Sequence, residues 1–132
     1  MPLALQFCLG YLFTITLETA VLLVGLSRRH PLKRKLLAGV WLTACTYPVV
    51  WFVCPALFDP TDKDQRPYYL LVAETFAPAA ECLIFLVAFV RGLPPKPWAT
   101  VQDMIVITVA NLVSFGAGEL LYWILAKLEQ SP

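Results

Sequence analysis

The stretch that decides the fold is residues 3–26, LALQFCLGYLFTITLETAVLLVGL, which holds a single charged side chain, Glu18. At about 1.5 Å of rise per helical residue, a run of roughly 20 apolar residues crosses a hydrocarbon core about 30 Å thick. The stretch therefore predicts a membrane-spanning helix. A carboxylate at the bilayer centre costs on the order of 3 kcal/mol, and such residues usually face the interior of a helix bundle.

The rest of the chain repeats this pattern. Of its 132 residues, 59% are hydrophobic and 14% are charged, and the mean hydropathy is +0.70. This composition leaves too little polar surface to coat a soluble globule. We expect four spans at about residues 3–26, 36–58, 68–90 and 104–126. Because the connectors are short, we predict an all-α integral membrane protein, an up-down bundle of four transmembrane helices in a single membrane domain, 1–132.

Lysine and arginine in the connectors set the expected orientation. Seven lie on one side of the four spans and three on the other; the seven are Arg28, Arg29, Lys33, Arg34, Lys35, Arg91 and Lys96, and the three are Lys63, Arg66 and Lys127. The positive-inside rule then places the basic loop 28–35 in the cytoplasm and both termini outside, in a plasma or inner membrane. A net charge of +1 gives no nucleic-acid signal, so membrane lipid is the expected surrounding.

Glu18 and Glu81 occupy matching positions in a possible internal repeat, because each begins the pattern E-x9-R-x2-P. The spans that follow also resemble each other: TACTYP, starting at Thr43, matches NLVSFG, starting at Asn111, in its polar, hydroxyl and aromatic positions. One interpretation is a tandem duplication of a helical hairpin, related by an axis along the membrane normal. A chance match is the alternative.

The four glutamates of the spans fall into two classes of depth. Glu18 and Glu81 each lie ten residues from the arginine of their repeat, so about 15 Å deep, near the midplane. Glu74 lies seventeen residues from Arg91, and Glu119 lies sixteen from Asp103, which we take as the inner charged boundary of the fourth span. Both are therefore about 25 Å from that boundary, near the outer headgroups, where water reaches them. We therefore treat these two as secondary rim candidates. The four spans contain no lysine, arginine or histidine to neutralise the midplane pair.

A polar layer is expected at the depth of the midplane pair. The second and fourth spans place hydroxyl and amide side chains there, and the predicted proton- or cation-binding residues are Glu18, Glu81, Asn111, Thr43, Thr46 and Ser114. The same residue types also mediate ordinary packing between membrane helices.

The midplane pair can be neutralised by a proton, by a cation or by an arginine of another protein, and these answers lead to the first two of three functional hypotheses. A bound proton or cation predicts coupling to the transport of a small solute, in a homo-oligomer. An arginine from another protein predicts a non-catalytic accessory or assembly subunit of a larger membrane complex. A weaker alternative is an intramembrane hydrolase that uses the two carboxylates as acid and base. The pattern favours a role other than enzyme, and it assigns no catalytic residue.

Several chemistries lack the residues they need. The chain has one histidine, His30, and its four cysteines form no CxxC motif. A histidine-ligated haem, a Ser-His-Asp triad and a multi-histidine metal site are therefore not predicted. The sequence has no glycine-rich phosphate loop, and no cofactor is expected.

Four short spans and a membrane-embedded glutamate on the first, Glu18, are similar to the small multidrug-resistance transporters. The chain departs from that family's pattern in Glu74, Glu81 and Glu119, in its parallel repeat and in its charge bias, which argues against insertion in two orientations. These departures leave the chain unassigned to that family.

Overall fold

The computed structural model describes residues 2–129, and these residues form helices without any strand. Four helical segments are long and apolar enough to cross a membrane: Leu3–Gly25, Leu32–Leu57, Arg66–Val90 and Pro97–Leu128. The all-helical class and the existence of four span-length apolar helices are thus confirmed. Residue 1 and residues 130–132 of the predicted domain lie outside the described part of the chain.

Two of the four long segments change their helical pitch along the way. The elements in chain order are α1 (Leu3–Gly25), α2 (Leu32–Pro48), the π-helical η1 (Val49–Val53), α3 (Cys54–Leu57), α4 (Arg66–Phe85), the π-helical η2 (Leu86–Val90) and α5 (Pro97–Glu129). The segment η1 directly follows Pro48, whose ring nitrogen cannot donate the backbone hydrogen bond of a regular α-helix.

The fourth span begins earlier than the sequence predicts. The expected start was residue 104, because Asp103 looked like a charge at the membrane boundary. In the structure α5 begins at Pro97, and the Asp103 side chain is completely buried. Proline suits the first turn of a helix, where its missing amide donor would be unused. The second span also starts earlier, at Leu32 rather than residue 36.

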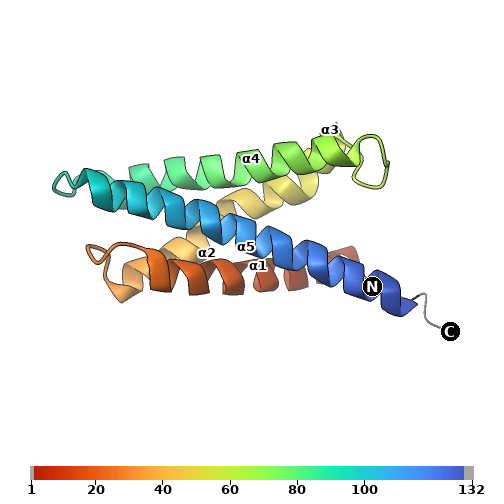
Figure 1. The fold of residues 1–132 in the computed structure, drawn as a ribbon, viewed down its shortest axis with the longest axis horizontal. Helices are drawn as coiled ribbons and strands as arrows, with labels where there is room; N and C mark the ends of the chain where they lie inside the picture. The colour runs from red at the N-terminus through yellow and green to blue at the C-terminus, as the bar shows by residue number, and fades with distance from the viewer. Residues whose placement is uncertain (1, 130–132) are drawn as a thin grey trace.

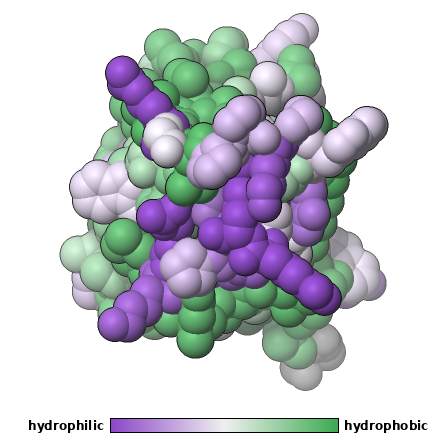
Figure 2. Space-filling view, turned by 90° about the vertical axis from the view of Figure 1, so that its left-hand side faces the viewer, coloured by the Kyte–Doolittle hydropathy of each residue, from purple (hydrophilic) through white to green (hydrophobic). Residues whose placement is uncertain are grey.

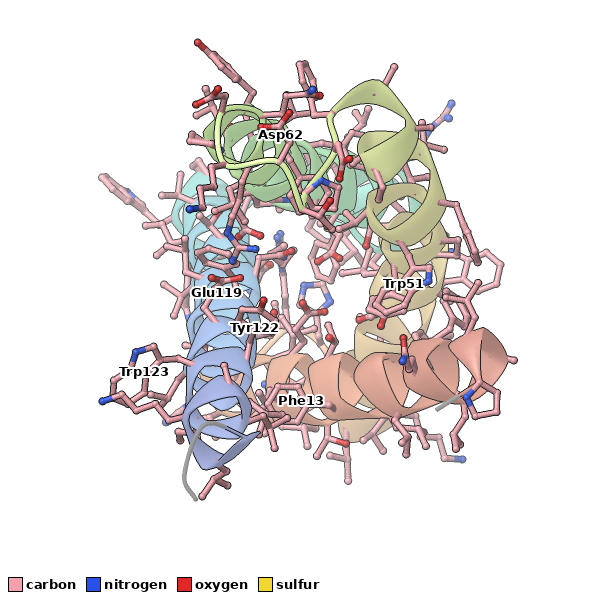
Figure 3. The ribbon with its side chains drawn as sticks, turned by 90° about the vertical axis from the view of Figure 1, so that its right-hand side faces the viewer. Phe13, Trp51, Asp62, Glu119, Tyr122 and Trp123 are labelled. Atoms are coloured by element: carbon pink, nitrogen blue, oxygen red, sulfur yellow. The ribbon has the colours of Figure 1, made fainter. Side chains whose placement is uncertain are left out.

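The long helices form a ring around a common axis. Helix α1 packs against α2 and α5, and α4 packs against the same two helices. Consequently α1 lies opposite α4, and α2 lies opposite α5 (Figure 3). In Figure 1 the connectors 26–31 and 91–96 lie at one end of the molecule, which we call the connector end. The connector 58–65 lies at the other end, with the first turn of α1 and the last turn of α5; we call it the loop end.

Close apolar packing is concentrated between the middle of the bundle and the connector end. All four long helical segments contribute to this core, which contains Leu22, Leu26, Ala38, Leu42, Phe85, Phe89, Ile107 and Ala110. Outside it, large apolar side chains are exposed on every long helix, as Val24 and Leu71 illustrate. At the connector end hydrophilic side chains gather in the middle, with hydrophobic ones around them (Figure 2). An apolar perimeter of this extent fits a lipid environment.

The connector at the loop end is held by its own hydrogen bonds. Asp59 Oδ1 accepts hydrogen bonds from the backbone amide and the hydroxyl of Thr61, at 2.8 and 2.7 Å. These two hydrogen bonds hold the pKa of the Asp59 carboxyl below its usual value. The side chain of Gln65 accepts a hydrogen bond from the Asp59 amide at 3.0 Å, which ties the connector to the residue just before α4.

Candidate functional site

Glu18 lies on α1, inside the ring, with 3% of its surface exposed. The Thr43 hydroxyl on α2 donates to its Oε2 at 2.6 Å, and the Ser114 hydroxyl on α5 donates to its Oε1 at 2.8 Å. Each carboxyl oxygen therefore has a donor from a different neighbouring helix.

Glu81 has an equivalent environment on α4 and is also 3% exposed. The Thr46 hydroxyl on α2 donates to its Oε1 at 2.7 Å, and the Asn111 amide on α5 donates to its Oε2 at 2.7 Å. All six residues that the sequence proposed for a central polar layer are therefore together in one layer. Helices α2 and α5 each supply one donor to each carboxyl group.

Each of the two hairpins supplies one donor to its own glutamate and one to the glutamate of the other hairpin. Thr43 and Asn111, which align in the possible repeat, each bond the glutamate of their own hairpin. Thr46 and Ser114, which also align, each bond the glutamate of the other hairpin. A two-fold axis relating α1–α2 to α4–α5 would produce this crossed pattern.

Helical spacing explains why α2 and α5 can serve both carboxyl groups. Thr43 and Thr46, like Asn111 and Ser114, are three residues apart, so each pair lies on one face of its helix. Each of the three hydroxyls also lies close to a carbonyl oxygen of its own helix: Thr43 Oγ1 is 2.9 Å from Gly39 O, Thr46 Oγ1 is 3.2 Å from Leu42 O, and Ser114 Oγ is 2.9 Å from Asn111 O. Because a hydroxyl carries one proton, it can donate to the carboxyl group or to the carbonyl, but not to both.

Neither Glu18 nor Glu81 has a cationic partner within residues 2–129. The ion pairs in this part of the chain join Arg29 and His30 to Asp103, and Arg66 to Glu119. Every carboxyl oxygen of Glu18 and Glu81 therefore has a hydrogen-bond donor, but all four donors are neutral. When either group is ionised, its charge has no counterion among these residues.

A cavity of about 210 Å³ extends from the polar layer towards the loop end. Its polar and aromatic lining consists of Thr14, Glu18, Thr43, Thr46, Tyr47, Tyr69, Glu74, Asn111, Ser114, Phe115 and Glu119. No lysine, arginine or histidine is among its lining residues, and Glu81 is not among them either. Glu18 lines the cavity directly, and both residues that donate to Glu81, Thr46 and Asn111, line it as well.

The two rim candidates have different surroundings. Glu119 accepts a hydrogen bond from Arg66 Nη2 at 2.7 Å, and the two side chains are 41% and 34% exposed. Arg66 also lies over the ring of Tyr122, 5.5 Å from its centroid. Figure 3 looks along the bundle from the loop end and shows Glu119 and Tyr122 on α5. Glu74 is on the cavity wall and has no hydrogen bond or ion pair within the described residues.

A second polar cluster, at the connector end, was missed by the sequence analysis. Asp103 accepts hydrogen bonds from Ser27 N at 2.7 Å, from Ser27 Oγ at 3.1 Å and from Arg29 Nη2 at 2.7 Å. His30 Nε2 lies 2.9 Å from Asp103 Oδ2. The sequence assigned Arg29 and His30 only to a basic loop, although one acid beside the fourth span was an available signal. We call these four residues the connector cluster.

Metal ligands are not grouped in the described part of the chain. Residues 2–129 contain no group of three or more His, Cys, Asp or Glu side chains placed to hold a metal ion. The four cysteines are free thiols in the structure. The candidate site is therefore a pair of carboxyl groups with neutral donors, next to an acidic cavity.

No family model, curated protein or solved structure matches the chain.

Proposed function

We propose that this chain is a small polytopic membrane protein, an up-down four-helix bundle, in which Glu18 and Glu81 bind a proton or cation whose movement is coupled to transport of a small solute. The observation that carries the proposal is the burial of two carboxyl groups, each 3% exposed, without a cationic partner in residues 2–129. Burying an ionised carboxylate without a counterion is expensive, so protonation or cation binding is the simplest way to neutralise the pair.

The hydroxyl groups around the pair can serve both protonation states. When Glu18 is ionised, Thr43 and Ser114 donate to its two oxygens. When Glu18 carries a proton, its own O–H can donate to one of these hydroxyl oxygens, and that hydroxyl turns to its backbone carbonyl. A proton can therefore enter or leave without heavy-atom movement and without leaving a polar group unpaired. Simple packing between helices would not require an ionisable group at this position.

The lining of the cavity favours a positively charged solute. Glu18 and Glu74 contribute carboxyl groups to a lining that has no basic residue. Tyr47, Tyr69 and Phe115 add aromatic rings, whose faces attract cations. A volume of about 210 Å³ restricts the cavity to a small molecule. A solute bound beside Glu18 would compete with the proton for the same negative charge, which is one way to couple their movements.

The crossed hydrogen bonds support a tandem duplication of the hairpin. In two copies of one hairpin related by a two-fold axis along the membrane normal, the second helix of each copy would supply hydrogen-bond donors to both glutamates. With the basic loop 28–35 in the cytoplasm, the cavity opens to the outside, where both termini lie. We also propose that the bundle forms a homo-oligomer.

The other two hypotheses receive less support from the geometry. An arginine of a partner protein would have to reach carboxyl groups that are 3% exposed and already hold two donors each. A hydrolase would need a water between the two carboxyl groups in addition to those donors.

Proteoliposomes loaded with a pH-sensitive dye test the proposal. A potassium diffusion potential is imposed, and proton entry is followed with and without small organic ammonium ions. We expect Glu18→Gln and Glu81→Gln each to lower the proton flux at least about tenfold, equivalent to about 1.4 kcal/mol. The exposed loop residue Asp64 provides a matched carboxyl control, and Asp64→Asn is expected to retain the flux.

Two results would contradict the proposal. One is a wild-type flux no greater than that of empty liposomes under every condition. The other is an unchanged flux in both glutamate variants. Native mass spectrometry of the mildly extracted protein adds a separate criterion, because a stable complex with a second membrane protein would favour the accessory-subunit hypothesis.

A further inference from the structure

The lining of the cavity contains three acidic side chains, and one of them is already paired. Glu119 accepts a hydrogen bond from Arg66 at 2.7 Å. The other two, Glu18 and Glu74, have no cationic partner among residues 2–129. The cavity therefore presents two carboxyl groups whose charges, when they are ionised, are not balanced by these residues.

Glu18 lies in the polar layer at the same level as Glu81. On α2 and on α5, the two donors of the layer are three residues apart, so one is about 4.5 Å nearer the loop end than the other. Glu18 accepts from the α2 donor on the connector side and from the α5 donor on the loop side, and Glu81 has the opposite combination. The two carboxyl groups are therefore level with each other along the bundle.

Glu74 lies on the same helix as Glu81, nearer to the loop end. The two residues are seven positions apart on α4, which is two turns, so they lie on one face of the helix. Seven residues of helical rise amount to about 10 Å. Glu74 is therefore about 10 Å closer to the loop end than Glu18, and it comes from the opposite helix of the ring (Figure 3).

A single metal ion does not fit two carboxyl groups at this spacing. Mg²⁺ and Ca²⁺ hold their oxygen ligands at about 2.0–2.6 Å, so carboxyl oxygens that share one ion lie within about 5 Å of each other. Residues 2–129 also contain no group of three metal-ligating side chains at this place. Two positive groups joined by a spacer would match the two carboxyl groups better.

The lining between the two carboxyl levels is mainly apolar. Ala77 lies between Glu74 and the polar layer on α4, and the same stretch of the cavity is lined by Val50, Phe115 and Gly118. The ring of Tyr47 lines the cavity next to the polar layer, one residue after Thr46. Methylene groups pack against such a wall, and the aromatic faces attract an ammonium group beside them.

Glu74 offers an acceptor besides its carboxyl group. Pro78 lies four residues later within α4 and has no backbone N–H, so the Glu74 carbonyl lacks the donor of a regular α-helix. Carbonyl groups of a helix point toward its C-terminus, which for α4 is the connector end. This carbonyl is thus directed toward the level of the polar layer. An ammonium group has three N–H donors, and a carboxylate with a nearby carbonyl satisfies more than one of them.

We propose that the solute is a short diammonium ion that lies along the cavity, with one ammonium group on Glu18 and the other on Glu74. The inference rests on the proposed function, because it names the substrate class of the same cavity. An ionised Glu18 has about four lone-pair positions, and the hydroxyls of Thr43 and Ser114 occupy two of them. The remaining two accept the inner ammonium group.

The level difference sets the length of the ion. A charge-assisted hydrogen bond of about 2.8 Å at each end leaves about 5 Å between the two nitrogen atoms along the bundle axis. Because Glu18 and Glu74 come from opposite helices, the full distance is somewhat longer. A saturated chain advances about 1.25 Å per bond, so the spacer that fits has about three to five carbons.

A length series tests the inference on the unaltered protein in lipid nanodiscs. Binding of 1-aminobutane and of diammonium ions from 1,3-diaminopropane to 1,8-diaminooctane is measured by competition against radiolabelled 1,4-diaminobutane. We expect the tightest binding at about three to five carbons, at least about tenfold tighter than 1-aminobutane, which has a single ammonium group. Equal binding of 1-aminobutane and 1,4-diaminobutane, no binding of either, or an affinity that rises steadily up to the longest chain overturns the inference.

Variants of Glu74 test the outer binding position. We expect Glu74→Gln to lower the preference for 1,4-diaminobutane over 1-aminobutane at least about fivefold. Glu74→Asp keeps the charge on a shorter side chain, so it should retain a preference and move the optimum to a longer diammonium ion. Asp64→Asn, in the exposed loop, is expected to keep the wild-type ratio and the wild-type optimum. Circular dichroism confirms that each variant is folded.

The proton-flux assay separates failure of the inference from failure of the proposed function. A Glu74→Gln protein that keeps the full preference for 1,4-diaminobutane overturns the diammonium inference alone, provided that the wild-type proton flux still depends on Glu18 and Glu81. A wild-type protein that carries no protons overturns the proposed function, whichever ammonium ion it binds.

Discussion

Glu18 and Glu81 lie on opposite helices of the ring, and each carboxyl group is held by one donor from α2 and one from α5. The two carboxyl groups therefore share their supporting helices although α1 and α4 face each other across the axis. A displacement of α2 against α5 would alter both sites at once. This arrangement gives a physical route by which binding in the cavity, which Thr46 and Asn111 line, affects Glu81 as well as Glu18.

The two threonines of α2 allow each carboxyl group to be perturbed separately. Thr43→Val and Thr46→Val remove one hydroxyl donor from Glu18 and Glu81 respectively, with little change of shape. A hydrogen bond to a charged group contributes about 1.5–3 kcal/mol, so loss of the donor favours the protonated carboxyl. We expect the carboxyl bands of the affected glutamate to change in the infrared spectrum, and those of the other glutamate to stay as in the wild type. Infrared titration of each variant, with the other threonine variant as its control, provides the measurement.

A shift of both glutamates in each threonine variant would contradict this assignment of donors. Infrared titration curves that are the same in both variants and in the wild type would show that neither hydroxyl stabilises a carboxylate.

Gly39 permits the close approach of α1 and α2. A Cβ atom at this position would overlap Thr19 Oγ1 and come within 3.0 Å of the Thr19 Cα. Because a backbone atom is involved, Gly39→Ala must push the helices apart, at a cost of about 1–3 kcal/mol. Gly116 is the matched control, since nothing lies within 4 Å of a Cβ there. Alanine at Gly116 should be neutral or stabilise by up to about 1 kcal/mol, because glycine is a poor helix former.

Thermal unfolding in detergent, followed by circular dichroism, measures both glycine variants. A Gly39→Ala protein as stable as Gly116→Ala would show that α1 and α2 are not packed as described.

Asp103 should be more important for stability than any other acid outside the polar layer. Its side chain is fully buried, and Asp103→Asn leaves the Arg29 guanidinium, 9% exposed, without its counterion. Removal of one partner from a buried ion pair typically costs about 3–5 kcal/mol. The control is Glu119→Gln, which removes the partly exposed pair with Arg66 and should cost no more than about 1 kcal/mol. Thermal unfolding in detergent measures the stability of both variants. Equal losses of stability in Asp103→Asn and Glu119→Gln would contradict the burial of the connector cluster.

Much of the polar layer could be predicted from the sequence. The distances of Glu18 and Glu81 from the charged connectors predicted a common level along the bundle. Helical rise is regular enough to bring Thr43, Thr46, Asn111 and Ser114 to that level. The spacing could not show which donor bonds which carboxyl oxygen. That detail depends on the order of helices around the ring and on their rotation about their own axes.

The connector cluster shows where sequence reasoning failed. Asp103 was taken as a membrane boundary because an isolated charge usually lies in water. Asp103 is buried instead, because the basic connector folds over the end of the bundle. There Arg29 and Ser27 donate hydrogen bonds to the Asp103 carboxylate and make its burial possible. The Arg66–Glu119 pair was missed because the partners are 53 residues apart, and only the tertiary fold brings them together.

The predicted orientation has a simple test in spheroplasts. Thr61 lies in the loop-end connector and Lys33 at the start of α2, and both are accessible enough to label. With a membrane-impermeant maleimide, Thr61→Cys should react in intact cells and Lys33→Cys only after permeabilisation, relative to the native thiols of the unaltered chain. The opposite labelling pattern would reverse the orientation and place the mouth of the cavity in the cytoplasm.

The most direct test of the central claim is a pH-difference infrared spectrum of the protein in lipid bilayers, because the C=O stretch of a protonated carboxyl group is separate from the carboxylate bands. Our account predicts exchangeable protonated-carboxyl bands in the wild type, with one component lost in Glu18→Gln and a different component lost in Glu81→Gln. Organic ammonium ions should remove the Glu18 component first, since this carboxyl group faces the cavity. A spectrum that is the same in the wild type and both variants, at every pH and with every cation, would contradict the claim that this pair holds an exchangeable proton or cation.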